Sequence, residues 1–220
     1  MNLARFLHGG PDERTGGSLI GGGRAYDLFA SAMFGGRRRV AYTTLARVSG
    51  ARSGDRVLDV GCGTGYLTRI MAEHVGPTGR ATGLDPSASV VAHARGLTRS
   101  SHCDYVDGIA ERLDFPDGSY DTVVTCLVMH HLPAAVRSTA IVEMARVLRP
   151  GGRILVADFR PPSGRIGRHV MDAVVGPAMS DNDVRALAPL VRDAGFQSVA
   201  EGRVRPWLHY VTAAKPDAAA

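Results

Sequence analysis

Apolar and polar side chains follow two different patterns along this chain, and the change comes near Gly50. Residues 24–34 and 37–50 repeat apolar side chains at the spacing of amphipathic helices, with Gly35 and Gly36 between them. Beyond Gly50, short apolar runs alternate with helical segments of roughly ten to fifteen residues. The pattern predicts a short N-terminal helical cap followed by an α/β domain.

The second part of the chain predicts a mostly parallel sheet. Five apolar runs are predicted as strands, at residues 56–60, 80–85, 102–107, 120–126 and 152–159. Helices are predicted over residues 64–75, 87–97, 134–148 and 181–196, with a kink at Pro189 in the last one. Strand–helix alternation is typical of a parallel sheet with right-handed crossovers and helices on both faces. Two final strand-like runs are joined by a short link, so the last strand is predicted to be antiparallel.

Length and composition fit a folded, soluble protein. The 220 residues suit one compact domain, which we assign to residues 51–220 after a flexible N-terminus and helical cap at 1–50. A second candidate cap covers residues 160–180. No stretch reaches the roughly 18 uncharged apolar residues of a membrane helix, and the first residues lack the apolar core of a secretory signal. We therefore expect a cytoplasmic protein.

Cysteines and charge narrow the partners. Cys62, Cys103 and Cys126 show no CxxC and no Cys/His metal spacing, so we expect reduced core thiols and no metal site. The formal net charge is +5, and nearly all of the positive charge is arginine, with Lys215 as the only lysine. The cluster at residues 37–39 is interpreted either as a solvated helix face or as a contact with an anionic substrate or a membrane surface.

The stretch "VLDVGCGTGYL" turns a predicted strand into a helix through Gly61, Gly63 and Gly65. Without Cβ atoms, these residues let a ligand lie on the backbone, where the next helix presents unpaired N–H groups. The GxGxxG spacing of dinucleotide-binding folds is not met. Asp59 would also repel a pyrophosphate, since a like-charge pair about 4 Å apart costs on the order of 4 kcal/mol. Asp59 instead favours a ligand with a cationic ammonium group.

Acidic residues end three successive predicted strands, at Asp59, Asp85 and Asp107. Parallel sheets of this kind bind ligands outside the carboxyl ends of their strands. Asp85 is placed to accept from ribose hydroxyls, and Asp107 to accept from an adenine amino group with Ile109 or Ala110 against the ring. One such acid is often only a helix cap, whereas three beside a glycine loop indicate an adenosyl ligand that carries an amino acid.

Four motifs, in this order, resemble those of class I S-adenosylmethionine-dependent methyltransferases: "VLDVGCGTGYLT", "GLDPS", "DGIAERLDFPDGSYDTVVTCLVMHHL" and "VLRPGGRILVAD". The lead-in "YDLF…GGRRR" is similar to the subgroup that methylates quinone rings, phospholipids and other small lipophilic acceptors. The resemblance implies a Rossmann-like seven-stranded sheet with an antiparallel last strand. It also implies S-adenosylmethionine as cofactor and S-adenosylhomocysteine as product.

The resemblance implies a set of cofactor-binding residues as well. They are Asp59, Gly61, Cys62, Gly63, Gly65, Asp85, Pro86, Asp107, Gly108, Ile109 and Cys126. In this scheme the glycine loop holds the methionine moiety, Asp85 takes the ribose, and residues 107–109 surround the adenine. Cys126 lies near the methionine end and acts through its backbone carbonyl. Pro86 and Tyr66 depart from the common pattern of the family.

The expected reaction is an in-line displacement at an already activated sulfonium methyl group, so alignment and desolvation supply most of the catalysis. A base is needed only if the acceptor must lose a proton. His130 and His131 follow the fourth strand of the predicted sheet, and one of them is a candidate base, with His130 favoured because it is nearer to the strand. The alternative is that both are structural. Tyr26 and His169 are further candidate contacts for the acceptor.

The expected partner is a small, lipophilic methyl acceptor, and nucleic acid is not expected. Two other functions stay open. An RNA methyltransferase would use the basic surface, but no Asn-Pro-Pro-Tyr or Asp-Pro-Pro-Tyr follows the fourth strand. A non-catalytic cofactor-binding homologue would keep the same loop. Contact with a membrane surface and a homodimer also stay open.

Overall fold

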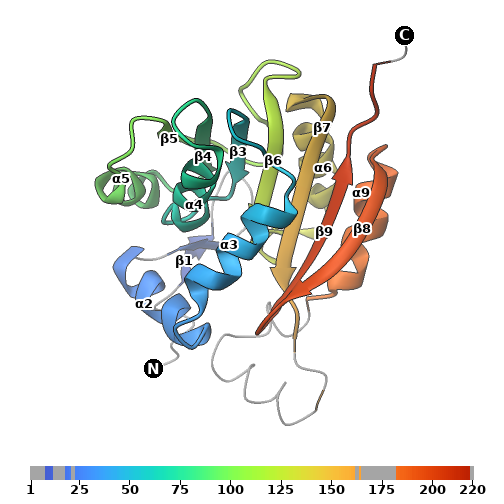
Figure 1. Cartoon of the computed structure of the whole chain (residues 1–220). Helices are drawn as coiled ribbons and strands as arrows, with labels where there is room; N and C mark the ends of the chain where they lie inside the picture. Colours follow the sequence, from blue (N-terminus) through green and yellow to red (C-terminus); the bar gives the residue numbers. More distant parts are fainter. Residues whose placement is uncertain (1–7, 12–17, 21–22, 162–163, 165–181, 219–220) are drawn as a thin grey trace.

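The computed structural model describes residues 8–11, 18–20, 23–161, 164 and 182–218. Over these residues the chain forms a seven-stranded sheet between two layers of helices (Figure 1). The strands are β3 (Arg56–Val60), β4 (Arg80–Asp85), β5 (Cys103–Asp107), β6 (Tyr120–Cys126), β7 (Leu148–Phe159), β8 (Gln197–Val204) and β9 (Leu208–Ala214). Their order in the sheet is β5-β4-β3-β6-β7-β9-β8, and β9 is antiparallel to both of its neighbours. The predicted Rossmann-like α/β fold with an antiparallel last strand is confirmed.

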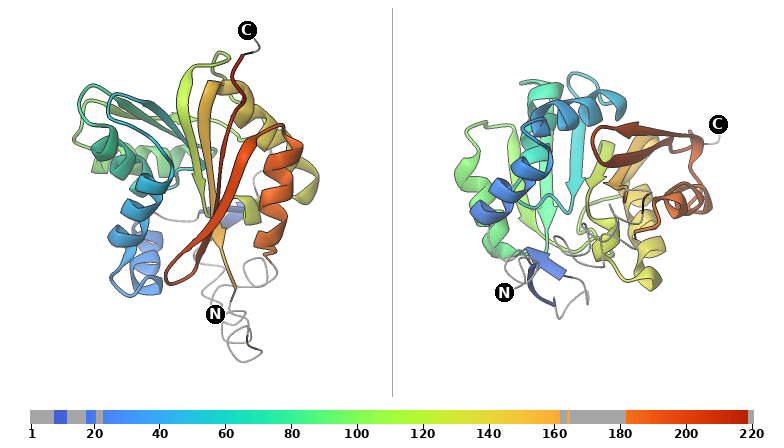
Figure 2. Two further views of the ribbon diagram at one scale, coloured as in Figure 1. Left: turned by 45° about the vertical axis from the view of Figure 1, so that its right-hand side comes forward. Right: turned by 90° about the horizontal axis from the view of Figure 1, so that it is seen from below.

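The helices cover both faces of the sheet (Figure 2). They are α2 (Gly23–Met33), α3 (Arg38–Val48), α4 (Tyr66–Val75), α5 (Ala88–Leu97), α6 (Ala134–Val147) and α9 (Leu187–Asp193), with the 3-10 turns η1 (Met129–His131) and η2 (Val184–Ala186). The helices α3, α4 and α5 pack on one face, and α6 and α9 pack on the other. The helices α2 and α3 correspond to the two helices predicted over residues 24–34 and 37–50.

The central strands send alternate side chains to opposite helix layers. In β3, Val57 packs on the side of α4, whereas Leu58 packs on the side of α6. Leu155 and Ile154 repeat this alternation in β7. This two-residue period is expected for strands that are buried on both faces, and it explains why they appear in the sequence as continuous apolar runs. It also directs Asp59 toward the layer that contains α4.

The helix predicted over residues 181–196 is shorter in the structure. The side-chain nitrogen of Asn182 donates to the carbonyl oxygen of Phe159 at 2.8 Å, which ties this segment to the end of β7. The side chain of Asp183 caps η2. Pro189 lies in the first turn of α9, where an N–H group would have no intrahelical partner. Pro189 therefore fits into the first turn of α9 and does not kink the helix.

The N-terminal region contains two strands that the sequence pattern did not predict. β1 (His8–Pro11) and β2 (Ser18–Ile20) pair antiparallel in a segment that we expected to be flexible. Their glycine-rich sequences carry no two-residue apolar period, which is the signal that identifies strands. Most of the second candidate cap, including His169, lies outside the described residues. Within the described part of the chain, no helix is long and apolar enough to cross a membrane.

Candidate functional site

A cavity lies at the carboxyl edge of the sheet, where β3, β4 and β6 end and α3 covers them. Sheets of this topology bind ligands at this edge. The residues from the predicted cofactor set that line it are Asp59, Gly61, Cys62, Gly63, Asp85, Pro86, Ile109 and Cys126. Gly65, Asp107 and Gly108 do not line the cavity. Most of the predicted set is therefore brought to one place, from four separate segments of the chain.

The loop after β3 lies against the loop after β6. Gly61 has a φ of 72°, and a Cβ atom at this position would overlap the side chain of Val128. The N–H groups of Gly61 and Cys62 donate to the carbonyl oxygen of Leu84 at 2.7 and 2.9 Å. Gly61 is required both by its left-handed backbone and by this close approach. These contacts hold the loop against the end of β4.

The side chain of Asp85 completes this connection between β4 and the glycine loop. Its Oδ2 accepts from the N–H of Gly63 at 2.9 Å, and its Oδ1 accepts from the N–H of Ser87 at 3.0 Å. Each carboxylate oxygen can accept more than one hydrogen bond, and the residue lines the cavity. Asp85 can thus fix the loop and still accept from a ligand.

Asp107 differs from the other two predicted acids. It pairs in register with Asp85 but is exposed, because β5 is the edge strand and no further strand lies beside it. The carboxylate that reaches the cavity on this side is Glu111, four residues later. Among the described residues, the buried Oε2 of Glu111 has no hydrogen-bond partner. The sequence pattern did not single out Glu111, because it stands four residues beyond the strand end, although it lies within the quoted stretch "DGIAERLDFPDGSYDTVVTCLVMHHL".

Asp59 is the most strongly perturbed acid at the cavity. It is 1% exposed, and the hydroxyl of Thr68 donates to its Oδ2 at 2.7 Å. Burial raises the pKa of Asp59 to about 7, and the nearby charge of Asp85 adds to the shift, whereas the Thr68 hydrogen bond opposes it. A cation bound in the cavity would stabilise the charged form of Asp59.

A buried arginine from the cap helix α3 brings positive charge to the same cavity. Arg38 is 5% exposed, and its Nη1 donates to Asp27 Oδ1 at 2.8 Å. The Thr64 hydroxyl donates to the same oxygen at 2.7 Å, so Asp27 joins α2, α3 and the glycine loop. The guanidinium carbon of Arg38 also lies 4.0 Å from the ring centroid of Tyr66. Within the cluster at residues 37–39, the outer two arginines are exposed as expected, but Arg38 is not.

The end of β6 brings strained backbone to the cavity. Leu127 has a φ of 62°, a left-handed conformation that non-glycine residues rarely adopt. Its N–H donates to the carbonyl oxygen of Ala157 at 2.9 Å, which holds it there. Burial raises the pKa of the neighbouring Cys126 thiol, and the charges of Asp158 and Asp59 raise it further. The thiol therefore stays protonated, and Cys126 is not an activated nucleophile.

The two histidines of η1 have different surroundings. His130 is buried and does not line the cavity, because its Nδ1 lies 2.7 Å from Oδ1 of the fully buried Asp158. His131 does line the cavity. The two rings lie 4.0 Å apart between centroids. The sequence favoured His130 as a base because it is nearer to the strand, but the residue that faces the cavity is His131. In the described residues no cluster of three or more His, Cys, Asp or Glu side chains is arranged to hold a metal ion.

Comparisons with known proteins agree with this geometry. Residues 57–152 match a family model described as "Methyltransferase domain". Over 152 residues the chain is 38% identical to the ubiquinone/menaquinone biosynthesis C-methyltransferase UbiE of Pseudomonas aeruginosa. The aligned region covers 67% of this chain and 59% of the UbiE protein. The chain belongs to the class I S-adenosylmethionine-dependent methyltransferases. The chain spans about three fifths of the length of this curated relative.

Solved structures of other proteins share the fold of this chain. Phosphoethanolamine N-methyltransferase 2 of Haemonchus contortus, in complex with S-adenosyl-L-methionine, superposes with a TM-score of 0.71 over 99% of this chain and 60% of that one, at 14% identity. The [4+2]-cyclase SpnF superposes with a TM-score of 0.63 over 82% and 81% of the two chains, at 22% identity. At these identities the likeness concerns the fold alone, and the two proteins are named for different reactions.

The polar groups that line the cavity fit S-adenosylmethionine, the cofactor of this family. S-adenosylmethionine carries an ammonium group, a carboxylate, a ribose diol and an adenine ring. The cavity presents the poorly compensated carboxylate of Asp59, the cation of Arg38 and the acceptor oxygens of Asp85. The unpaired Oε2 of Glu111 adds an acceptor on the side of Ile109 and Ala110.

Proposed function

We propose that this protein transfers a methyl group from S-adenosylmethionine to a small, lipophilic acceptor. The observation that carries the proposal is the carboxyl-edge cavity, in which Asp59 is buried with little compensation while Asp85 holds the glycine loop. A buried carboxylate whose pKa is raised in spite of its hydrogen bonds from Thr68 is costly to keep charged. It is accounted for if a cationic ligand completes its environment.

Each part of the cavity has a role in this proposal. Asp59 and the glycine loop bind the ammonium end of the methionine moiety, and Arg38 supplies positive charge for its carboxylate. The loop residues Gly61, Cys62, Gly63 and Gly65 provide a backbone surface without bulky side chains, and Cys126 borders the same end through its main chain. Asp85, followed by Pro86, accepts from the ribose hydroxyls.

The adenine side is assigned partly by sequence and partly by the structure. Ile109 and Ala110 pack against the ring, and Glu111 offers a buried acceptor for its amino group. Gly108 keeps the chain close to β4, since a Cβ at this position would meet the Leu84 side chain at 2.7 Å. Asp107 was the predicted acceptor. Its exposure places it at the rim, so we transfer that role to Glu111.

The cofactor supplies a methyl group that its positively charged sulfur already activates. The protein aligns the acceptor and excludes water from the cavity. His131 lines the cavity and is the side chain placed to accept a proton from an acceptor hydroxyl or amino group. An acceptor without such a proton would not need this residue.

The acceptor class rests on the relatives. The UbiE proteins are named for C-methylation in ubiquinone and menaquinone biosynthesis, and the lead-in with residues 24–39 is similar to that subgroup. We therefore propose a quinone-type or other small lipophilic ring compound as the first acceptor to test.

The proposal is tested on the full chain. Calorimetric titration with S-adenosylhomocysteine should give saturable binding, and methyl transfer from labelled S-adenosylmethionine should appear with reduced prenylated naphthoquinones in an acceptor panel. Absence of binding at several temperatures would contradict cofactor use. Binding without transfer to any small acceptor would favour a non-catalytic homologue. Transfer to RNA, weakening steeply as salt is raised, would favour the RNA alternative.

A further inference from the structure

Behind the cavity lies a buried acid that the proposed function does not use. Asp158 is 0% exposed and stands one residue before the end of β7. Its carboxylate receives three donors: the backbone N–H of His130 at 3.0 Å, His130 Nδ1 at 2.7 Å, and the backbone N–H of Phe159 at 2.6 Å. Two of these three donors belong to a single residue, so the carboxylate fixes both the main chain and the ring of His130.

This pair joins the ends of two neighbouring strands. His130 belongs to η1, which follows β6, whereas Asp158 belongs to β7. The two strands pair in parallel up to Cys126 and Ala157. The hydrogen bond from Leu127 to Ala157 holds the strained residue that connects β6 to η1. Together these contacts fix the position of the turn relative to the sheet edge where the cavity lies.

The fixed turn determines where His131 lies. The His130 ring is stacked at an angle of 41° against the His131 ring, with 4.0 Å between centroids. His130 is enclosed, with a side chain 2% exposed, and His131 reaches the cavity. To donate from Nδ1 to Asp158, His130 must carry a hydrogen on that nitrogen, so the pair also selects the ring's tautomer.

We propose that Asp158 and His130 are positioning residues that hold η1 so that His131 contacts the methyl acceptor. The inference rests on the proposed function and assigns catalytic contact to the second histidine of the pair. A buried polar pair usually adds less stability than apolar side chains of the same size would, because its groups must lose their hydration. Retaining the pair beside the cavity is accounted for if it determines the geometry of the neighbouring residue.

The first test uses turnover and a conservative replacement. His130→Asn keeps a side-chain N–H that can donate to Asp158 in place of the ring, whereas His130→Leu keeps only the backbone N–H. We expect His130→Leu, Asp158→Asn and His131→Asn each to lower kcat about tenfold or more with the acceptor found above, and S-adenosylhomocysteine affinity to stay within about threefold. His130→Asn should recover most of the rate lost in His130→Leu. The matched control is His74→Asn, at a histidine of α4 whose ring is hydrogen-bonded to the carbonyl oxygen of Ala51.

Two turnover results would overturn the proposal. If His130→Asn is as slow as His130→Leu, the His130 ring itself acts in the reaction. If His131→Asn transfers methyl at the normal rate, His131 does not contact the acceptor.

The second test needs no acceptor. In the 15N-histidine-labelled full chain with bound S-adenosylhomocysteine, long-range 1H–15N spectra should show His130 protonated at Nδ1. Asp158→Asn should shift the ring signals of His131 while the His74 signals stay unchanged. Unshifted His131 signals would contradict the positioning role. If no acceptor is methylated, the proposed acceptor chemistry fails, and this spectrum still decides whether Asp158 positions His131.

Discussion

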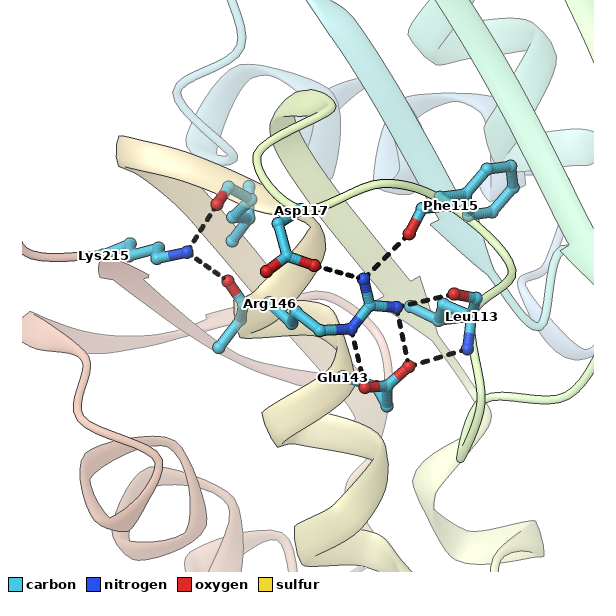
Figure 3. Close-up of polar contacts among 8 residues, drawn as sticks. Leu113, Phe115, Asp117, Glu143, Arg146 and Lys215 are labelled. Atoms are coloured by element: carbon cyan, nitrogen blue, oxygen red, sulfur yellow. Dashed lines mark hydrogen bonds and ion pairs between the residues drawn. The ribbon is translucent and has the colours of Figure 1, made fainter.

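The two edges of the sheet treat charged side chains in opposite ways. At the carboxyl edge, Asp59 is buried, and its pKa is raised to about 7 in spite of hydrogen bonds from Thr68. At the amino edge, Arg146 near the end of α6 is enclosed by partners of opposite or partial negative charge (Figure 3). Asp59 thus carries an electrostatic cost, whereas the charge of Arg146 is matched by the carboxylates of Glu143 and Asp117.

The amino edge is a dense hydrogen-bond network. Arg146 binds Glu143 through Nε at 2.8 Å and Nη2 at 2.9 Å, and donates to the carbonyl oxygens of Leu113 and Phe115 at 2.6 and 2.8 Å. Its Nη1 also donates to Asp117 at 2.7 Å. The hydrogen bonds from Arg146 lower the pKa of Glu143, in contrast to Asp59. This network holds the segment that leads from the cavity back to β6.

The contrast separates charges that serve the fold from charges that serve a ligand. A charged group that only supports the fold is expected to have partners within the protein. A charged group that binds a ligand keeps part of its hydrogen-bonding and electrostatic demand unmet until the ligand arrives. Removing the charge of Asp59 at the carboxyl edge should therefore raise stability, whereas removing that of Arg146 at the amino edge should lower it.

The largest effect is expected for Asp59→Asn. This change should weaken S-adenosylhomocysteine binding about 100-fold, since a hydrogen-bonded charge interaction is lost. It should also raise the free energy of unfolding at pH 8. Calorimetry and urea denaturation measure the two quantities. Asp104→Asn, at a half-exposed acid on β5 that pairs with Arg80, is the control. Parallel losses of affinity and stability in Asp59→Asn would contradict the comparison.

The same acid should produce a distinctive pH dependence. The pKa of Asp59 rises from 3.8 to about 7 on folding, so folding takes up a proton between these values. The free energy of unfolding therefore falls as pH rises through this window, by on the order of 4 kcal/mol from this group. The stability advantage of Asp59→Asn should shrink as pH is lowered to about 5, and ligand affinity of the natural protein should fall below about pH 7.

The next effect compares one glycine from each edge. Gly61 and Gly76 have nearly equal φ values of 72° and 73°. Only at Gly61 would a Cβ atom overlap a neighbour, the side chain of Val128, whereas at Gly76 the nearest atom is 3.7 Å away. We expect Gly61→Ala to destabilise by about 3 kcal/mol. Gly76→Ala should cost about 2 kcal/mol from backbone strain alone, because the ψ of Gly76 is −175°, a conformation that residues other than glycine rarely adopt. Equal losses in urea denaturation would show that backbone strain alone matters.

At the amino edge, Arg146→Met should lower stability by about 2–3 kcal/mol, because Glu143 and two carbonyl groups lose their donor. Arg146→Lys keeps the charge but not the planar fork of donors, so it should recover only part of the loss. S-adenosylhomocysteine affinity, measured by calorimetry on folded protein, should change little. A loss of affinity as large as that of Asp59→Asn would mean that the amino edge also shapes the cavity.

The smallest effect concerns Lys215. Its ammonium group donates to the carbonyl oxygens of Ala145 and Leu148 at 2.7 and 2.6 Å, at the C-terminal end of α6 (Figure 3). Lys215→Met should cost about 1 kcal/mol through the loss of this cap. Urea denaturation of the double variant with Arg146→Met tests whether the two contacts are independent. Stability unchanged in Lys215→Met alone would limit the amino-edge network to Arg146.

By itself, the sequence determined the fold and the main positions of the site. Periods of two and of three to four residues record which faces are buried, so the bounds of β3, β4 and β6 were predicted to the residue. Glycine spacing and the strand-end positions of Asp59 and Asp85 depend on local backbone geometry, which neighbouring residues encode. The kink predicted at Pro189 was wrong, because the effect of a proline depends on where its helix begins, and the sequence pattern placed that start too early.

Only the tertiary structure decided which side chains meet in the cavity. Arg38 looked like one member of a surface cluster, and Glu111 stood beyond the end of its strand, yet both line the cavity, whereas Asp107 lies exposed on an edge strand. The sequence could not distinguish His130 from His131, because the choice is made by Asp158, 28 residues away along the chain. Such choices depend on the packing of distant segments against one another, and no local pattern of residues records that packing.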